Sequence, residues 1–492
     1  MGYKKVSEIL GKSVKVLLSE NTHIYVGGTL TDFKAIHLDD DFLQQLERIT
    51  PGRVSLSTDV RNQHGKDMSY HDGAPPDAVV YAHSTDEVSK VVTLCAKSCV
   101  PVIPFGAGTS LEGHVAALHG GVSLDLTGMN QILAVHDEDL NITVEAGVTR
   151  KQVNQYLRDM GLFFPIDPGA DATIGGMTAT RASGTNAVRY GTMRENVMAL
   201  TVVLADGQVI KTGTRAKKSS AGYDLTHLFV GSEGTLGVVT EITLRLYGIP
   251  EATVAAVCSY ATLEGAVNTV ISTIQMGIPV ARIELVDDVQ MDAINKYSKL
   301  DYPVQPTLFF EFHGTENGVQ EQSELVNEIS QEQGGSDFVW ARKAEDRSRL
   351  WQARHDAYLA ALAMRPGYQG VVSDVCVPIS RLAGCILETR KDIDATGLYA
   401  PIVGHVGDGN FHLATMINPN DSQQLDKAKQ LNARLVARAL EMEGTCTGEH
   451  GVGYGKLDYM ETEHGAAIGV MRTLKKSLDP ENIMNPGKII RL

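Results

Sequence analysis

Cysteine is scarce in this sequence, and closely spaced cysteine pairs are absent. The chain has six cysteines among 492 residues and no Cys-x-x-Cys pair. Disulfide scaffolds and iron–sulfur proteins need denser or more regular cysteines, so both classes are excluded. Reduced thiols favour a cytoplasmic location, either free or peripheral to the inner membrane, or the mitochondrial matrix if a transit peptide has been removed.

Long apolar runs and basic clusters are also missing. No uninterrupted apolar stretch reaches membrane-spanning length, and residues 1–20 alternate lysine with apolar residues without a signal-peptide core. The formal net charge is −15 and no basic run occurs, which argues against nucleic acid or an anionic membrane as the main partner. We therefore expect a protein without a transmembrane segment that acts on small molecules.

Glycine, in contrast, is abundant, with 48 residues, and 43% of the chain is hydrophobic. This composition is typical of a well-packed protein of helices and strands with many tight loops, and the length predicts two or three domains. Residues 1–50 predict two helical segments. A strand at Ala78–Tyr81, a helix opened by Ser84 and a strand at Val102–Phe105 follow.

A glycine-rich loop, Gly106–His114, comes next and precedes another strand, Gly121–Leu126. Backbone N–H groups of such a loop can face a pyrophosphate. The Rossmann fingerprint needs a small residue five positions after its first glycine and a helix after the loop. Here that position is Leu111 and a strand follows, so the loop is a nucleotide loop of another type or a simple turn.

Three more loops of small residues follow in the same region: Pro168–Gly176, Ser183–Gly191 and Gly231–Gly237. Loops of this length inside a compact domain usually serve a function. Each one alone could be turn chemistry. Together, the four loops indicate a large, flat, phosphate-bearing cofactor that lies against backbone.

Two histidines, His405 and His412, flank the turn-forming residues Gly407-Asp408-Gly409-Asn410. Their odd separation would point them to opposite faces of a straight strand, but the central residues can fold the strand back so that both imidazoles converge. A second glycine-rich stretch, Thr447–Gly453, adds Glu449 and His450.

Two histidines and one carboxylate leave coordination positions open, as in catalytic metal sites. We predict one divalent metal, either zinc, manganese or iron, held by His405, His412 and Glu449. The alternative is that these are polar loop residues satisfied by local hydrogen bonds, as a lone histidine usually is. Three histidines and a glutamate on two glycine-rich loops favour a site.

One arginine interrupts the apolar face of a long helix predicted over residues 339–364. That face consists of Leu350, Trp351, Tyr358, Leu359 and Leu362. Arg354 lies amid it without an acidic partner on its own helix, so it must bind an anion from elsewhere or extend to water. The functional interpretation is a clamp for a substrate carboxylate.

The glycine-rich motifs, in this order, resemble a known flavoprotein type. The runs at 104–114 (PFGAGTSLEGH), 167–177 (DPGADATIGGM), 183–191 (SGTNAVRYG) and 231–238 (GSEGTLGV) resemble the FAD domain of the vanillyl-alcohol-oxidase type. The resemblance implies an α+β fold. It would have a two-part FAD-binding domain (PCMH type), an α/β substrate (cap) domain and a C-terminal segment that returns to the FAD domain. The implied boundaries are 1–50 for an N-terminal helical segment, 51–250 for FAD, 251–455 for the cap with the metal site, and 456–492 for the C-terminal segment.

By this resemblance the protein binds FAD noncovalently, although His114 raises the question of a covalent bond, which some members of the superfamily have. The implied FAD contacts are Phe105, Gly106, Ala107, Gly108, Thr109, Ser110, Gly113, His114, Pro168, Gly169, Ala170, Asp171, Thr173, Gly175, Gly176, Ser183, Gly184, Tyr190, Gly191, Glu233, Gly234, Gly237, Val239 and Asn485.

The two histidine-containing loops resemble those of the D-2-hydroxyacid dehydrogenase branch, and in particular the cytochrome-linked D-lactate dehydrogenases. The resemblance covers about residues 75–492 and puts a substrate-binding arginine at Arg354. Relatives that oxidise 2-hydroxyglutarate carry a lysine where this chain has Val372. The implied substrate is therefore D-lactate or a related small monocarboxylate.

A 2-hydroxy acid can chelate a divalent ion through its hydroxyl and carboxylate oxygens. The metal would lower the pKa of the hydroxyl, Arg354 would fix the carboxylate, and His450 would take the hydroxyl proton while hydride passes from C2 to flavin N5. The catalytic residues are then His450 and Arg354. The metal ligands His405 and His412 also face the substrate, and Asn410 either binds it or orients a ligand.

Electrons would leave to a non-nicotinamide acceptor such as a cytochrome, a quinone or an electron-transfer flavoprotein. Several alternatives remain open: the flavin subunit of a multi-subunit glycolate oxidase, a D-2-hydroxyglutarate dehydrogenase, a metal-dependent hydrolase and a structural nucleotide-binding protein. The sequence also leaves open the oligomeric state, including a homodimer.

Overall fold

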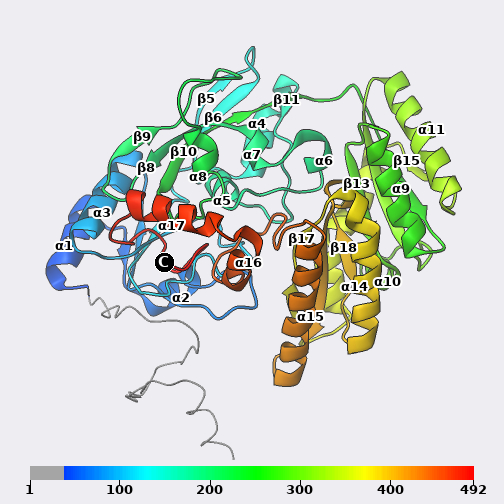
Figure 1. Cartoon of the computed structure of the whole chain (residues 1–492). Helices are drawn as coiled ribbons and strands as arrows, with labels where there is room; N and C mark the ends of the chain where they lie inside the picture. Colours follow the sequence, from blue (N-terminus) through cyan, green and yellow to red (C-terminus); the bar gives the residue numbers. More distant parts are fainter. Residues whose placement is uncertain (1–37) are drawn as a thin grey trace, which may run out of the picture. The chain divides into compact units, whose positions relative to one another are not determined.

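A computed structural model of the protein describes residues 38–492 (Figure 1). The second predicted N-terminal helix is confirmed as α1 (Asp40–Ile49), which begins at Asp39, whose side chain accepts a hydrogen bond from the Phe42 N–H. The first predicted helical segment lies outside the described residues. Among residues 38–492, no helix is both long and apolar enough to span a membrane.

The first sheet has the strand order β1-β2-β4-β3, and β2, β4 and β3 run parallel. It consists of β1 (Val54–Ser55), β2 (Ala78–Tyr81), β3 (Val102–Phe105) and β4 (Val122–Asp125). The predicted helix after Ser84 is α3 (Thr85–Lys97), which packs on α1; α2 (Thr58–His64) contacts β2. The loop Gly106–His114 thus leaves the sheet at the end of β3.

The second sheet is antiparallel, with the order β5-β6-β10-β8-β9. Its strands are β5 (Ile132–His136), β6 (Asn141–Glu145), β8 (Val197–Val203), β9 (Val209–Lys211) and β10 (Val238–Arg245), and β7 (Leu162–Phe163) pairs separately with β11 (Tyr247–Gly248). Its helices are α4 (Arg150–Leu157), α5 (Ile174–Thr180), α6 (Ala187–Tyr190), α7 (Met193–Asn196) and α8 (Leu225–Phe229). Of the three later glycine-rich stretches, Gly231–Gly237 is a loop between α8 and β10, whereas Pro168–Gly176 runs into α5 and Ser183–Gly191 contains α6.

The strands from β12 to β19 form one eight-stranded sheet. Its order is β15-β12-β14-β13-β18-β19-β16, and β17 pairs with β19. Its strands are β12 (Ala252–Ser259), β13 (Arg282–Val286), β14 (Thr307–Gly314), β15 (Val339–Ala341), β16 (Gln369–Val372), β17 (Val375–Cys376), β18 (Ile402–Gly404) and β19 (Asn410–Ile417). Its helices are α9 (Leu263–Gln275), α10 (Asp288–Ser298), α11 (Glu316–Glu332), α12 (Ala344–His355), α13 (Ala357–Ala363), α14 (Leu382–Thr396) and α15 (Ser422–Glu441).

Strand alternation gives this sheet two different faces. In β14, Phe310 and Phe312 pack in a core with α9, α11, α14 and α15, whereas Phe309 packs in another core with α10 and α12. The charged residues Glu284 and Glu311 alternate with Ile283 and Phe310, so they share the face of Phe309. The chemistry described below lies on that face.

The predicted single helix over residues 339–364 is wrong in two respects. Residues 339–341 form β15, because Val339, Trp340 and Ala341 pair with β12 at the sheet edge and this pairing overrides local helical preference. The helix also breaks at Asp356, between α12 and α13. In α13, Ala360 is buried, whereas the predicted face residue Leu359 is 50% exposed.

The C-terminal segment returns to the first sheet, as expected. After α16 (Met460–His464) and α17 (Ala467–Leu478), the chain runs beside β3, where the Val102 N–H donates to Ile483 O and the Asn485 N–H donates to Val102 O. Figure 1 shows this red segment together with the blue and green elements. Ile483 and Met484 are buried in the core of the FAD half, so that half is built from two separate parts of the chain.

This packing predicts a stability cost for Met484→Ala. Because Met484 is fully buried, we expect its truncation to lower the free energy of unfolding by about 2–5 kcal/mol. Urea unfolding should show a lower midpoint with an unchanged slope. Met276→Ala, at a side chain that is 60% exposed, is the matched control and should change little. Equal midpoints for the two variants would contradict the described packing.

Candidate active site

The two predicted metal-binding histidines lie on a tight hairpin. β18 ends at Gly404, a 3₁₀ turn covers Val406–Asp408, and Gly409 adopts a left-handed conformation (φ 81°) before β19. β18 and β19 pair antiparallel, with Val403 opposite His412. The predicted fold-back is therefore confirmed, and it brings His405 and His412 to a ring separation of 5.5 Å.

Glu449 lies between these two histidines. Its Oε1 is 3.1 Å from His405 Nε2 and 3.3 Å from His412 Nε2, and one ligand atom from each of the three residues falls within 4.8 Å of the others. Burial opposes the charge on His405, but Glu284 and Glu449 outweigh burial and hold the pKa of His405 well above its usual range. A positive charge, either a proton or a metal ion, therefore suits this position.

The Nδ1 atoms of His405 and His412, which face away from Glu449, both have hydrogen-bond acceptors. His405 Nδ1 lies 2.8 Å from Glu284 Oε1, and His412 Nδ1 lies 3.1 Å from the Ser373 carbonyl oxygen. With Nδ1 engaged by these acceptors, the Nε2 atoms of both histidines face Glu449, and Nε2 is the nitrogen available to a metal. Outer acceptors of this kind accompany metal-bound histidines in general, so the donor set fits a divalent metal.

A second cluster, Asp374, His412 and His450, also has converging ligand atoms. Its carboxylate is already occupied: Asp374 Oδ2 accepts from Thr447 Oγ1 and from the backbone N–H groups of Glu449 and His450, and Oδ1 accepts from Asn410 Nδ2. Asp374 therefore supports the site from behind. The sequence reasoning missed it, although a charged residue beside a short buried strand was a signal.

Asp374 also carries a charge that the interior must balance. It is fully buried, and burial alone would raise its pKa. His450, Lys456 and His412 outweigh burial and hold the pKa of Asp374 well below its usual range. Asn410, which was expected to bind substrate or orient a ligand, donates to Asp374 and to the Val375 carbonyl, and its buried Oδ1 has no partner within the described residues.

His450 stacks on His412 with the ring centroids 4.9 Å apart and an interplanar angle of 10°. Burial, together with His412, lowers the pKa of His450, although Asp374 opposes this effect. Its Nδ1 is buried and has no hydrogen-bond partner in the part of the chain that the structure describes. A lowered pKa suits His450 to accept a proton beside the proposed metal ligands.

Arg354, on the apolar face of its helix, forms an ion pair with a carboxylate from another element. Its guanidinium pairs with Glu284, which lies 70 residues earlier on β13. The same carboxylate accepts from His405, so Glu284 joins the predicted clamp to the predicted metal ligand. Arg354 Nε is buried without a partner among the described residues, and this donor remains for a further anion.

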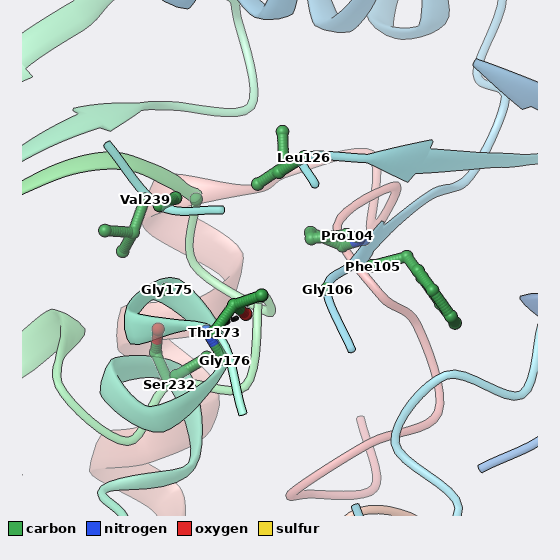
Figure 2. A pocket seen from close by; sticks show the side chains of 13 residues that line it. Pro104, Phe105, Gly106, Leu126, Thr173, Gly175, Gly176, Ser232 and Val239 are labelled. Carbon is green, nitrogen blue, oxygen red and sulfur yellow. Dashed lines mark hydrogen bonds between the residues drawn. The ribbon is translucent and has the colours of Figure 1, made fainter. Parts of the chain in front are cut away.

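Three of the four predicted cofactor loops contribute to one pocket, shown in Figure 2, whereas Ser183–Gly191 does not line it. Its lining comprises Pro104, Phe105, Gly106, Leu126, Ala146, Thr173, Gly175, Gly176, Ala179, Ser232, Gly234, Gly237 and Val239. A Cβ on Gly106 would lie 2.5 Å from Thr173 Oγ1, and one on Gly234 would lie 2.9 Å from Pro104. The wall is thus backbone and apolar surface, which fits a flat, phosphate-bearing cofactor.

Of the predicted FAD contacts, Phe105, Gly106, Thr173, Gly175, Gly176, Gly234, Gly237 and Val239 line this pocket. The remaining predicted contacts do not line it. The Tyr190 hydroxyl bonds His313, Asn485 Nδ2 donates to the carbonyls of His114 and Glu233, and the buried Nδ1 of His114 lacks a partner within residues 38–492. These roles toward FAD stay predictions.

Comparison with known proteins agrees with the fold and the pocket. Residues 76–213 match the model of an FAD binding domain, and residues 249–489 match that of the C-terminal domain of FAD linked oxidases. A probable mitochondrial D-lactate dehydrogenase of Danio rerio is 54% identical over 89% of each chain. The mitochondrial D-lactate dehydrogenase [cytochrome] of Arabidopsis thaliana is 48% identical over 92% of this chain and 80% of that one.

Solved structures share the fold at low identity. The 4-ethylphenol oxidase of Gulosibacter chungangensis superposes with a TM-score of 0.76 at 18% identity, covering 91% of this chain and 96% of that one. The family models and the relatives from Danio rerio and Arabidopsis thaliana define an FAD-dependent oxidoreductase, so the hydrolase and structural-protein alternatives are wrong. Within this class, the chain belongs to the family of FAD-linked D-lactate dehydrogenases of the vanillyl-alcohol-oxidase type.

The hydrogen bonds of Asp374 predict a large effect for Asp374→Ala. The substitution leaves the Lys456 ammonium and several N–H groups without their buried acceptor, and removal of one partner from a buried ion pair costs about 3–5 kcal/mol. Chemical unfolding measures this loss. The exposed residue Asp426, changed to alanine, is the control. A loss of unfolding free energy as small as that of the control would show that Asp374 does not stabilise the stretch with Thr447, Glu449 and His450.

Proposed function

We propose that this protein oxidises D-lactate, or a related small D-2-hydroxy monocarboxylate, to the 2-oxo acid. One observation carries the proposal: Glu284 binds both Arg354 and His405. A 2-hydroxy acid has its carboxylate on the carbon that bears the hydroxyl, so its two binding groups must be neighbours. The names of the relatives from zebrafish and Arabidopsis support D-lactate as the substrate.

In this proposal each residue has one task. His405 and His412, through Nε2, and Glu449, through its carboxylate, hold a divalent metal that polarises the substrate hydroxyl when bound. Arg354 binds the substrate carboxylate with Nε, the donor that has no partner among the described residues. His450 accepts the hydroxyl proton at a ring nitrogen. FAD, when bound, takes the hydrogen of C2 with its electron pair.

In this proposal, no positively charged residue contacts the side chain of the substrate. Val372 on β16 stands where relatives that oxidise 2-hydroxyglutarate carry a lysine, and it pairs with Ala414. An apolar residue cannot bind a second carboxylate. This feature favours a monocarboxylate such as lactate over 2-hydroxyglutarate.

A bound FAD would need a separate acceptor for the electrons it takes from the substrate. All six cysteines are free thiols, and their spacing offers no iron–sulfur ligands, so the chain has no internal relay of that kind. The name of the Arabidopsis relative supports a cytochrome as the acceptor, and both relatives' names support a mitochondrial location.

The base assignment predicts the outcome of His450→Ala. The variant should retain flavin and metal, because neither ligand set includes His450, while turnover with D-lactate falls about 10²–10⁴-fold. Flavin absorbance, metal analysis and steady-state assays measure the three quantities. His83→Ala, at an exposed position, is the control. Near-normal turnover in His450→Ala would eliminate His450 as the base.

His405→Ala separates the metal role from the base role. It removes one of three protein ligands, so both metal content and turnover should fall while FAD stays bound. Elemental analysis of the purified protein, compared with His450→Ala, distinguishes the two roles. Full metal occupancy in His405→Ala would exclude His405 as a ligand.

A further inference from the structure

The segment from Thr447 to Lys456 carries Glu449 and His450 but forms no helix or strand. Its backbone N–H groups therefore need acceptors from other parts of the chain. The structure provides them from two sides, and the two sides belong to different halves of the protein.

On the cap side, Asp374 accepts from the Glu449 and His450 N–H groups, each at 2.9 Å, and from Thr447 Oγ1 at 2.7 Å. These bonds set the direction of the Glu449 and His450 side chains. Asp374 directly precedes β17, which pairs with β19, the strand of His412. The cap sheet thus fixes the first half of the segment.

On the FAD side, Glu233 fixes the second half. Its two carboxylate oxygens accept from the Val452 N–H at 2.7 Å and from the Gly453 N–H at 2.8 Å. The Glu112 carbonyl then accepts from the N–H groups of Tyr454 and Gly455. Glu112 and Glu233 both belong to the glycine-rich cofactor loops. Glu233 lies 219 residues before Val452 in the sequence.

Glu233 has little freedom to move independently of its loop. It adopts a left-handed conformation (φ 51°), its N–H donates to Ala179 O, and its carbonyl accepts from Asn485 Nδ2. Its neighbours Ser232 and Gly234 line the cofactor pocket. A Cβ on Gly451 would lie 2.6 Å from Glu233 Oε1, so the carboxylate fills the space beneath the segment.

We propose that Glu233 is a positioning residue that couples FAD binding to metal binding. Ordering of the cofactor loop by FAD fixes the Glu233 carboxylate, which fixes Val452 and Gly453 and so the Glu449 ligand a few residues earlier. Each cofactor then strengthens binding of the other. The proposal rests on the metal site proposed above, but not on the identity of the substrate.

The test compares the dissociation constant of FAD with and without metal in the full-length protein. Flavin fluorescence gives this constant in saturating Mn²⁺ and, separately, in EDTA, with a parallel series in Zn²⁺. In the wild type, we expect FAD to bind about tenfold more tightly with metal, within the 5- to 150-fold range typical of coupled sites. Linkage requires that FAD tighten metal binding by the same factor, which a metal titration of FAD-loaded and FAD-depleted protein checks.

Glu233→Gln tests the residue itself. The amide keeps the shape but can accept only one of the two N–H bonds, so the ratio of the two FAD constants should fall close to one. A merely structural role would weaken FAD binding equally with and without metal and leave the ratio unchanged. Glu241→Gln, on β10 with a bond to Thr201, is the matched control and should keep the wild-type ratio.

Four outcomes would each support or contradict the coupling of FAD and metal binding through Glu233. A wild-type ratio of one overturns the coupling even if Glu233→Gln fails to fold, and an unchanged ratio in folded Glu233→Gln overturns the role of Glu233. Failure to bind any metal overturns the metal site and the coupling together. Coupling in a protein whose flavin D-lactate does not reduce would uphold this proposal while the proposed substrate fails.

Discussion

The buried carboxylate of Asp374 is the interaction on which the active site depends. A fully buried charge is costly unless several donors and a counter-charge surround it. Here Asn410, Thr447, two backbone N–H groups and Lys456 do so. Because the segment Thr447–Lys456, which has no regular secondary structure, supplies all of these groups except Asn410, satisfying Asp374 also orients Glu449 and His450.

The large cap sheet brings the remaining residues together through simple alternation. One face of β13, β14 and β19 is apolar and packs on α9, α11 and α14, and the other face carries Glu284, Glu311 and His412. Arg354 on α12 approaches that second face and pairs with Glu284. A single sheet thus combines a packed core on one side with a chemical surface on the other.

The sequence predicted features that depend on local chemistry. The glycine-rich stretches and the hairpin between His405 and His412 are readable because turn residues specify them. The return of the C-terminal segment followed from the resemblance to a known flavoprotein family. Glu284 and Asp374 were missed because their partners lie 36 to 121 residues away in the sequence, and only the tertiary fold brings them together. The helix predicted through Val339 failed for the same reason, since a distant strand determined its conformation.

The most direct test of this account is the visible absorbance of the purified protein under anaerobic conditions during addition of D-lactate. The account predicts that D-lactate bleaches the flavin band, while L-lactate, glycolate and D-2-hydroxyglutarate do so far less. It also predicts that a chelator abolishes the bleaching and that added divalent metal restores it. A flavin band that D-lactate leaves unchanged in metal-loaded protein would contradict the proposed function.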